Sequence, residues 1–555
     1  MAGDLNQLVA AAADALQAGD FEGAAAQLTT RLAEVDDPVA HEMLGGIHYA
    51  EHRLADSRRS LEAAFRGFRD AGDLRRAARI AADLAELHVT AFGNEAAGRG
   101  WVERARRLLA KVGPCVEWGY VDLAYIACAR PDVDELQESA ERALELAFEF
   151  DDRHLEVRAL ADLGLALVSQ GHIAEGLRRL DEAMAIITAG EVSDLSTAGR
   201  SFCAMLSSCE RTGDLRRAEE WMRLVHELLL GPTAGRPIVL GNHCRVAYGA
   251  VLSSAGRWPE AEEVLLEALS TATWETEMHR VESACRLATL RLDQGQVEEA
   301  ARVLAPYEDR LAACEPLARI HLLQGEPEMA AAVAERGLGE MVGDALRGAG
   351  LLAVLVDAEL ARNDLDAADR AAQRLARIAA EGDSPVVAAQ TAMASAKVLV
   401  ARGATAEASS VLRDAKGRLV AEERPVLAAT LRTELAATLD AEGDEAGAIA
   451  EARAALAVFD RLGVQPGRDR ARAILRRLGV HSRSASAEDA DTLLAELTKR
   501  EREVFDLLRL GLTNAEIAGR LFISAKTTEH HVGRILSKLG VRSRAEAVAL
   551  AGIGV

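Results

Sequence analysis

One face of a predicted helix near the C-terminal end of the chain combines side chains that could read DNA. Apolar residues at helical spacing, Val532, Ile535, Leu536 and Leu539, define the side that faces a core. At ~100° per residue, polar and small residues occupy the opposite face: Lys526, His530, Gly533, Arg534 and Ser537. Such a face offers donors and acceptors to base edges in a major groove, and its cations can contact phosphates. The pattern therefore predicts binding of double-stranded DNA.

The rest of the chain offers no comparable arrangement for catalysis. It contains no Gly-x-x-x-x-Gly-Lys-Ser/Thr loop for phosphates, no His-Glu-x-x-His motif and no paired-carboxylate constellation. The seven cysteines are scattered without a Cys-x-x-Cys pair, and the adjacent His530 and His531 have no third ligand in the sequence around them. We therefore expect no enzyme activity, no cofactor and no metal site.

Local start and stop signals divide the segment that carries this face into four short helices. Three Ser/Thr-x-x-Glu capping boxes each open a helix: Thr498–Glu501, Thr513–Glu516 and Ser543–Glu546. Ser524 is the predicted N-cap of the helix that carries the polar face, and Phe522-Ile523 forms the tight turn before it. This order predicts a helix-turn-helix at about 513–539, within a domain that spans 493–555.

The same residues resemble the DNA-binding domain of LuxR-type transcriptional regulators of bacteria. The resemblance runs through four motifs: Leu497-Thr498-Lys499-Arg500-Glu501-Arg502-Glu503-Val504, Asn514-Ala515-Glu516-Ile517-Ala518 with Leu521-Phe522-Ile523-Ser524, Lys526-Thr527-Thr528-Glu529-His530-His531-Val532, and Lys538-Leu539-Gly540-Val541-Arg542-Ser543-Arg544. It implies that the third helix enters the major groove and that the last helix pairs two subunits, so we expect a homodimer on DNA. Thr528 stands where the family usually has Val, and we expect its hydroxyl to bond back within the helix.

The resemblance also assigns roles to individual residues. It places Glu529, His530 and Gly533 at base-reading positions. It makes five further residues candidate contacts to the DNA backbone: Lys526, Thr527, His531, Arg534 and Lys538. Thr513 and Asn514 complete the predicted DNA-binding set. Glu529 could accept from cytosine N4 or could repel phosphate, and Arg534 and Lys538 could be ordinary surface cations.

The preceding residues, 1–479, predict an all-α repeat body. Ala and Leu dominate the apolar residues and aromatics make up only 4% of the chain, which favours helices over sheets. Turn-forming triplets recur 30 to 43 residues apart, and they begin with Gly171, Gly213, Gly256, Gly295, Gly325, Asn363, Gly403 and Gly443. Gly19 and Gly72 look like earlier members of the series. The body resembles tetratricopeptide-type repeats with a longer period than usual, so we expect an α-solenoid, with a possible joint near 231–237.

Charge separates the body from the DNA-binding segment. The whole chain carries a formal charge of −22, whereas residues 491–555 contain 10 Lys+Arg and 8 Asp+Glu, a net +2, which leaves −24 for the remainder. A Ser-rich stretch at 480–492 predicts a flexible linker between them. No apolar run is long enough to span a membrane, and the Cys usage suits a reducing cytoplasm, where we expect the protein.

We interpret the chain as a sequence-specific transcriptional regulator whose body senses a protein or small-molecule effector. The absence of a P-loop indicates that it lacks the ATPase found in large LuxR-type regulators. Asn242-His243-Cys244 and Trp258 could line an effector groove, although core packing is the simpler interpretation. The acidic body could also hold the basic segment off DNA. The alternative is an interaction scaffold whose C-terminal module mainly dimerises.

Overall fold

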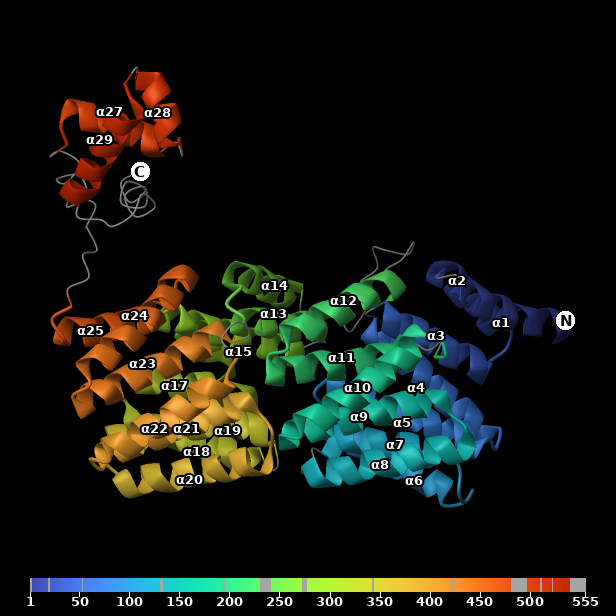
Figure 1. Cartoon of the computed structure of the whole chain (residues 1–555). Helices are drawn as coiled ribbons and strands as arrows, with labels where there is room; N and C mark the ends of the chain where they lie inside the picture. The colour runs from blue at the N-terminus through green and yellow to red at the C-terminus, as the bar shows by residue number, and fades with distance from the viewer. Residues whose placement is uncertain are drawn as a thin grey trace. The chain divides into compact units, whose positions relative to one another are not determined.

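The computed structural model is helical throughout its described part and shows two compact units (Figure 1). It describes residues 2–17, 20–51, 53–129, 133–192, 195–229, 241–271, 277–341, 344–420, 424–480, 497–509, 512–521 and 523–539, and no strand occurs among them. The units are Met1–Leu478, the repeat body, and Gly479–Val555, the C-terminal module. The all-α class predicted from composition is confirmed. Within these residues, no helix is both long and apolar enough to cross a membrane.

The repeat body is a stack of helical hairpins. Its first part contains α1 (Ala2–Gln17), α2 (Phe21–Glu34), α3 (Pro38–Ala50), α4 (Leu54–Asp70), α5 (Leu74–Thr90), α6 (Glu95–Leu109), α7 (Glu117–Ala129), α8 (Val133–Phe150), α9 (Arg153–Gln170), α10 (Ile173–Thr188), α11 (Leu195–Thr212) and α12 (Leu215–Leu229). Most odd-numbered helices pack mainly against the even-numbered helix that follows; α11 instead packs mainly against α9 and α13 (Gly241–Ser254), and consecutive odd-numbered helices from α5 to α13 also contact one another. This is the nearest-neighbour packing of a solenoid.

The second part of the body continues the same alternation. It contains α13 (Gly241–Ser254), α14 (Trp258–Thr271), α15 (Glu277–Asp293), α16 (Val297–Leu304), η2 (Ala305–Tyr307), η3 (Leu311–Ala313), α17 (Cys314–Leu323), α18 (Pro327–Glu340), α19 (Ala345–Ala361), α20 (Leu365–Glu381), α21 (Pro385–Ala401), α22 (Thr405–Arg418), α23 (Pro425–Glu442), α24 (Glu445–Leu462) and α25 (Gln465–Arg477). The predicted solenoid of helical hairpins is confirmed.

The recurring Gly and Asn residues sit where the sequence pattern places them. All eight residues from Gly171 to Gly443 in the series have positive φ, between 60° at Asn363 and 100° at Gly171, and each lies between the two helices of a hairpin. The Asp that follows three of these turns caps the next helix: Asp214 accepts from Arg217 N, Asp364 from Ala367 N and Asp444 from Gly447 N.

Gly72 is a correction to the predicted series. It has the same positive φ of 81°, but it lies between α4 and α5, which belong to successive hairpins. The hairpins on either side turn elsewhere, between α3 and α4 and at Gly93-Asn94 between α5 and α6. The same Gly-Asp turn chemistry therefore serves both kinds of connection, and a turn motif alone does not say which helices pair. Gly19 lies outside the described residues.

Small residues allow the helices of a hairpin to approach closely. In the hairpin of α9 and α10, a Cβ on Gly164 would lie 2.8 Å from the carbonyl oxygen of Gly176. A side chain at either position would push the two helices apart. The Ala-rich core elsewhere follows the same principle, because fully buried alanines line successive hairpins, for example Ala77, Ala81, Ala368 and Ala448.

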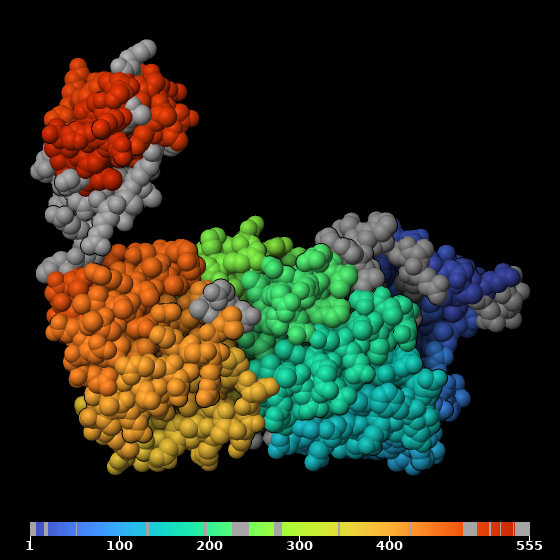
Figure 2. Space-filling view, in the orientation of Figure 1, coloured from blue at the N-terminus to red at the C-terminus, as the bar shows by residue number. Residues whose placement is uncertain are grey.

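The repeat body also folds back on itself, so that early hairpins contact late ones. Asp383, in the loop between α20 and α21, accepts from the backbone N of Ile173 at 2.6 Å and of Ala174 at 3.2 Å. Its own N donates to the carbonyl oxygen of Gly171 at 2.9 Å. The N-cap residue of α10, His172, makes no side-chain capping bond. Asp383, 210 residues away in the sequence from Ile173, supplies the cap instead. In Figure 2 the teal surface of the early hairpins adjoins the yellow surface of the later ones.

The residues proposed for an effector groove in the body belong to its core. Cys244 is 7% exposed and Trp258 is 4% exposed, and the Trp258 ring N donates to the carbonyl oxygen of Ser253. They pack into two neighbouring apolar clusters. The side chains of Asn242 and His243, the possible joint at 231–237, and the linker from residue 481 onward lie outside the described residues.

Candidate nucleic-acid interface

The C-terminal module is built around three described helices, α27 (Lys499–Arg509), α28 (Asn514–Leu521) and α29 (Ala525–Leu539). Their apolar faces form one cluster that contains Val504, Phe505, Leu508, Ile517 and Ile535, each at most 2% exposed. The predicted fourth helix and its Ser543–Glu546 capping box, together with Phe522, lie outside the described residues.

Both described capping boxes form as predicted. The Glu501 carboxylate accepts from Thr498 N at 2.9 Å, and Glu501 N donates to Thr498 Oγ1 at 3.3 Å. The Glu516 carboxylate accepts from Thr513 N at 2.7 Å in the same manner. These reciprocal bonds satisfy the first amide groups of α27 and α28 and set where each helix begins.

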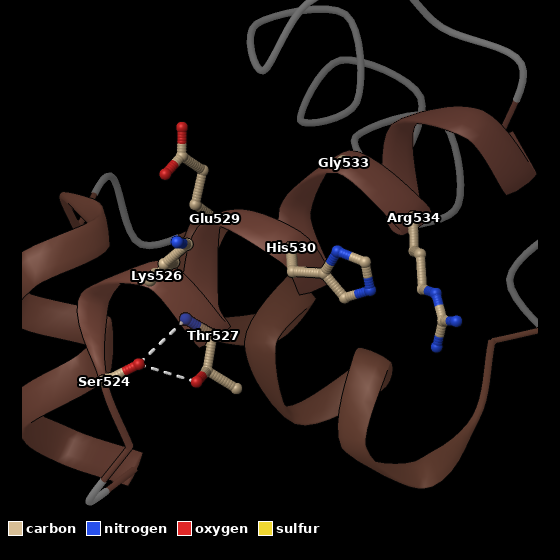
Figure 3. Close-up of a pocket in the computed structure, with 7 residues that line it drawn as sticks. All are labelled: Ser524, Lys526, Thr527, Glu529, His530, Gly533 and Arg534. Carbon is tan, nitrogen blue, oxygen red and sulfur yellow. Dashed lines mark hydrogen bonds between the residues drawn. The ribbon is translucent and has the colours of Figure 1, made fainter.

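Ser524 caps the helix that carries the polar face. Its Oγ accepts from Thr527 N at 3.1 Å and lies 2.7 Å from Thr527 Oγ1 (Figure 3). One residue further, Thr528 is fully buried, and its hydroxyl donates to the Ser524 carbonyl oxygen at 3.3 Å. The expected hydrogen bond from Thr528 back to its own helix is therefore present. This bond satisfies the hydroxyl, so a polar residue can occupy a buried position on the apolar face of the helix.

The outer face of α29 forms an open groove. Seven residues line it: Ser524, Lys526, Thr527, Glu529, His530, Gly533 and Arg534. All are exposed. In Figure 3 the Glu529 carboxylate points away from the His530 and Arg534 side chains, which lie on the same side of the helix. Six of these residues belong to the predicted DNA-binding set; Ser524 was predicted only as a cap, although its exposed position at the helix start was a sign that it also lines the groove.

Four groove side chains have no hydrogen-bond or ion-pair partner among the described residues: Lys526, Glu529, His530 and Arg534. The fold does not use their charges and donors for its own stability. Gly533 has no atom within 4 Å of the place a Cβ would occupy, so the surface beside it is open. The face can therefore approach a polyanion closely and offer it cations and hydrogen-bond donors.

The other four predicted residues lie outside the lining of the groove. The Thr513 hydroxyl is used in its capping box. Asn514 and His531 are half-buried, and Asn514 Oδ1 and His531 Nδ1 are buried atoms without a hydrogen-bond partner in the described part of the chain. Lys538 Nζ donates to the Glu501 carboxylate at 2.7 Å, which ties the end of α29 to the start of α27. The structure thus gives Lys538 a role in the fold that the sequence analysis missed.

The ion pair with Lys538 perturbs Glu501 strongly. Its side chain is 4% exposed, and its carboxylate accepts hydrogen bonds from Lys538 and from Thr498. These donors, that of Lys538 foremost, lower the pKa of Glu501 to about 2. The carboxylate therefore stays ionised at neutral pH and links two of the three described helices.

A family model described as bacterial regulatory proteins, luxR family, matches residues 495–551. The spore germination protein GerE of Bacillus subtilis (strain 168) is 56% identical over 52 residues, which are 9% of this chain and 70% of that protein. The chain belongs to the LuxR family of bacterial regulatory proteins.

Two further relatives of this LuxR-family chain match it over a smaller share of their own length. The DNA-binding transcriptional activator DevR/DosR of Mycobacterium tuberculosis (strain ATCC 25618 / H37Rv) is 44% identical over 66 residues, 12% of this chain and 30% of that protein. The oxygen regulatory protein NreC of Staphylococcus aureus (strain JH9) is 47% identical over 55 residues, 10% of this chain and 25% of that protein. The chain thus matches less than a third of the length of these two regulators.

Two solved structures are similar to most of the chain at low sequence identity. The first is the APC/C hetero-tetramer Cut9-Hcn1, with a TM-score of 0.47 and 13% identity, and the match covers 85% of this chain and 96% of that chain. The second is the yeast Tom70, with a TM-score of 0.30 and 11% identity, and the match covers 88% of this chain and 99% of that chain.

Proposed function

We propose that the protein is a sequence-specific, double-stranded-DNA-binding transcriptional regulator. The observation that carries this proposal is the outer face of α29, whose Lys526, Glu529, His530 and Arg534 have no partner within the described residues. Membership of the LuxR family supports the same function. In this proposal α29 enters the major groove, where Glu529 and His530 contact base edges and Lys526 and Arg534 contact phosphates.

The repeat body supplies the regulation in this proposal. Solenoids present extended surfaces to peptides, proteins or small molecules, and the body contains most of the chain. An effector bound there would alter dimerisation or access of the module to DNA. We propose that the active form on DNA is a homodimer, so that its operator has internal two-fold symmetry.

The test is selection of genomic fragments by the full chain, compared with the variant Lys526→Ala/Arg534→Ala. Lys538 is unsuitable for this purpose because its removal would also break the ion pair with Glu501. The matched control is Lys499→Ala/Arg509→Ala, which removes the same charges from exposed positions on α27, away from the groove.

We expect symmetric sites enriched by the wild type and by the control, with affinity falling steeply as salt rises. The groove variant should bind at least about tenfold more weakly, with a salt slope smaller by about two, one for each lost phosphate contact. Equal binding by the groove variant would contradict the proposed interface. No binding by the full chain or by residues 481–555 would favour the interaction scaffold.

A further inference from the structure

Two cysteine thiols from neighbouring hairpins meet inside the repeat body. Cys203 lies on α11 and Cys244 on α13, and their Sγ atoms are 3.3 Å apart. A disulfide bond is about 2.0 Å long, so a modest rotation of the two side chains would bring the sulfurs to bonding distance. The helices α11 and α13 already pack against each other, which holds the two thiols together.

The other five cysteines lack these features. All seven lie in the described part of the chain, and Cys203 is the one that is not fully buried. Burial raises the pKa of the Cys128 and Cys285 thiols to about 12 and also raises that of Cys209, which is fully buried. Buried thiols of this kind react slowly, because the thiolate is the nucleophile.

The two thiols differ in exposure. Cys203 on α11 is half-buried, whereas Cys244 on α13 is buried, with 7% of its surface exposed. A small oxidant therefore reaches Cys203 first, and Cys244 is the second thiol to react.

We propose that Cys203 and Cys244 form an oxidisable dithiol, which a peroxide converts into an intramolecular disulfide. The Cys203 thiolate attacks one oxygen of hydrogen peroxide; the O–O bond breaks, and hydroxide leaves and takes up a proton. Cys244 then attacks the sulfur of the resulting sulfenic acid; the S–O bond breaks and water leaves. In total, two thiols lose two protons and two electrons, and one peroxide is reduced to two waters.

The disulfide would join parts of the body that lie on either side of the segment 230–240. Helix α11 packs against α9, α10 and α3, whereas α13 packs against α14 and α15. A bond between Cys203 and Cys244 fixes the first group of hairpins to the second. The regulatory role of this disulfide rests on the proposed function. The formation of the disulfide itself does not.

The site is tested by treating the reduced full chain with a small excess of hydrogen peroxide, blocking remaining thiols with N-ethylmaleimide and digesting with trypsin. Cleavage after Lys and Arg places Cys203 in the peptide 201–211, together with Cys209, and Cys244 in the peptide 224–245. The variant Cys209→Ser serves as background, so that a cross-link between these peptides identifies one pair.

We expect the cross-linked peptides in the background and in the matched control Cys209→Ser/Cys285→Ser. They should be absent when either Cys203→Ser or Cys244→Ala is added, and both of these variants should show the helical circular dichroism of the parent. Oxidation of Cys203 to sulfinic acid without a cross-link, or cross-links mainly between chains, would overturn the proposal.

The regulatory role is tested in a separate experiment, which measures the affinity of the protein for the enriched DNA fragments. We expect the oxidised and reduced full chains to differ at least about threefold in affinity, and expect no difference after Cys203→Ser. A disulfide that forms without any change in affinity would overturn the regulatory role. Loss of DNA binding in both states would refute the proposed function, while the cross-link result would still decide the modification site.

Discussion

At the scale of single residues, the groove on α29 combines two kinds of side chain. Lys526 and Arg534 carry full positive charges, whereas Glu529 and His530 are short, directional groups on the same exposed surface. Phosphate contacts position a protein on DNA without reading its sequence, and contacts to base edges provide the discrimination. The two kinds of residue should therefore respond differently to substitution.

We predict that His530→Ala relaxes sequence preference, whereas Lys526→Ala weakens binding evenly. Loss of a base contact should lower the ratio of specific to nonspecific affinity by about tenfold, which corresponds to 1–3 kcal/mol per contact. Loss of a phosphate contact should leave that ratio unchanged and reduce the salt slope by about one. Titration of the preferred site and a scrambled site at several salt concentrations measures both. Unchanged discrimination in His530→Ala would remove it from the base-reading set.

Glu501 is a residue whose effect on stability depends on pH. Its pKa of about 2 in the fold lies below the ordinary value of 4.5, so its carboxylate stabilises the module fully above pH 4.5. That contribution is lost as the pH falls from 4.5 towards 2. We predict that Glu501→Gln lowers the free energy of unfolding of residues 481–555 by about 2 kcal/mol at neutral pH, because it weakens both the cap and the ion pair with Lys538.

Urea unfolding of residues 481–555, followed by far-ultraviolet circular dichroism at several pH values, checks this prediction. The wild type should lose stability between pH 4.5 and pH 2, and Glu501→Gln should lose much less in that window. Glu503→Gln is the comparison on the same helix, since Glu503 is more exposed and, within the described residues, forms its ion pair with Arg500. An equal loss in both variants would mean that the ion pair with Lys538 contributes nothing measurable.

At the scale of elements, the hairpin turns do more than reverse the chain. The turn at Gly171 receives the loop that carries Gly382 and Asp383. The turn at Gly213 lies close to the side chain of Arg424, another residue far along the chain. Both turns therefore lie where early and late parts of the body meet, and the turn at Gly171 also forms hydrogen bonds across that contact.

We predict that Asp383→Ala exposes the start of α10. The variant removes the carboxylate that accepts from Ile173 N and Ala174 N, and the loss of a helix cap costs about 1–2 kcal/mol. Hydrogen exchange measured by mass spectrometry should be faster in peptides that cover 171–176, while α20 itself remains protected.

The control for this prediction is Asp414→Ala, an exposed carboxylate on α22. It should leave exchange at 171–176 as in the wild type. Gly382→Ala should reproduce the effect of Asp383→Ala, because its Cβ would lie 2.9 Å from the carbonyl oxygen of Gly171. Unchanged exchange in both Asp383→Ala and Gly382→Ala would show that the contact between the two parts of the body is not formed in solution.

At the scale of the whole molecule, the distribution of charge suggests how the body could regulate the module. The residues before Asp491 carry a net charge of −24, and those from Asp491 onward carry +2. A strongly acidic body tethered to a DNA-binding module competes with DNA for its cations and repels the duplex. This effect needs no specific contact between the two units.

We predict that deletion of residues 1–480 raises affinity for DNA at equal salt, and that the difference shrinks as salt rises, because screening weakens the repulsion. Fluorescence anisotropy with one labelled fragment compares the two proteins, with dimerisation measured at the same concentrations. Weaker binding by residues 481–555 at matched dimer concentration would instead assign the body a positive role in binding.

The sequence alone determined the features that depend on neighbours in the chain. Helix periodicity, the boxes at Thr498 and Thr513, and the positive φ at turns such as Gly171 follow from short-range sterics and hydrogen bonds. The polar, exposed face of α29 was predictable for the same reason, since one helix presents it.

Only the tertiary structure decided which distant residues meet. The cap that Asp383 places on α10, the ion pair of Lys538 with Glu501 and the approach of Cys203 to Cys244 join residues 37 to 210 positions apart. No local pattern marks these pairs. They exist because the packing of whole helices brings their ends and faces together, and that packing is set by the summed burial of many small apolar side chains.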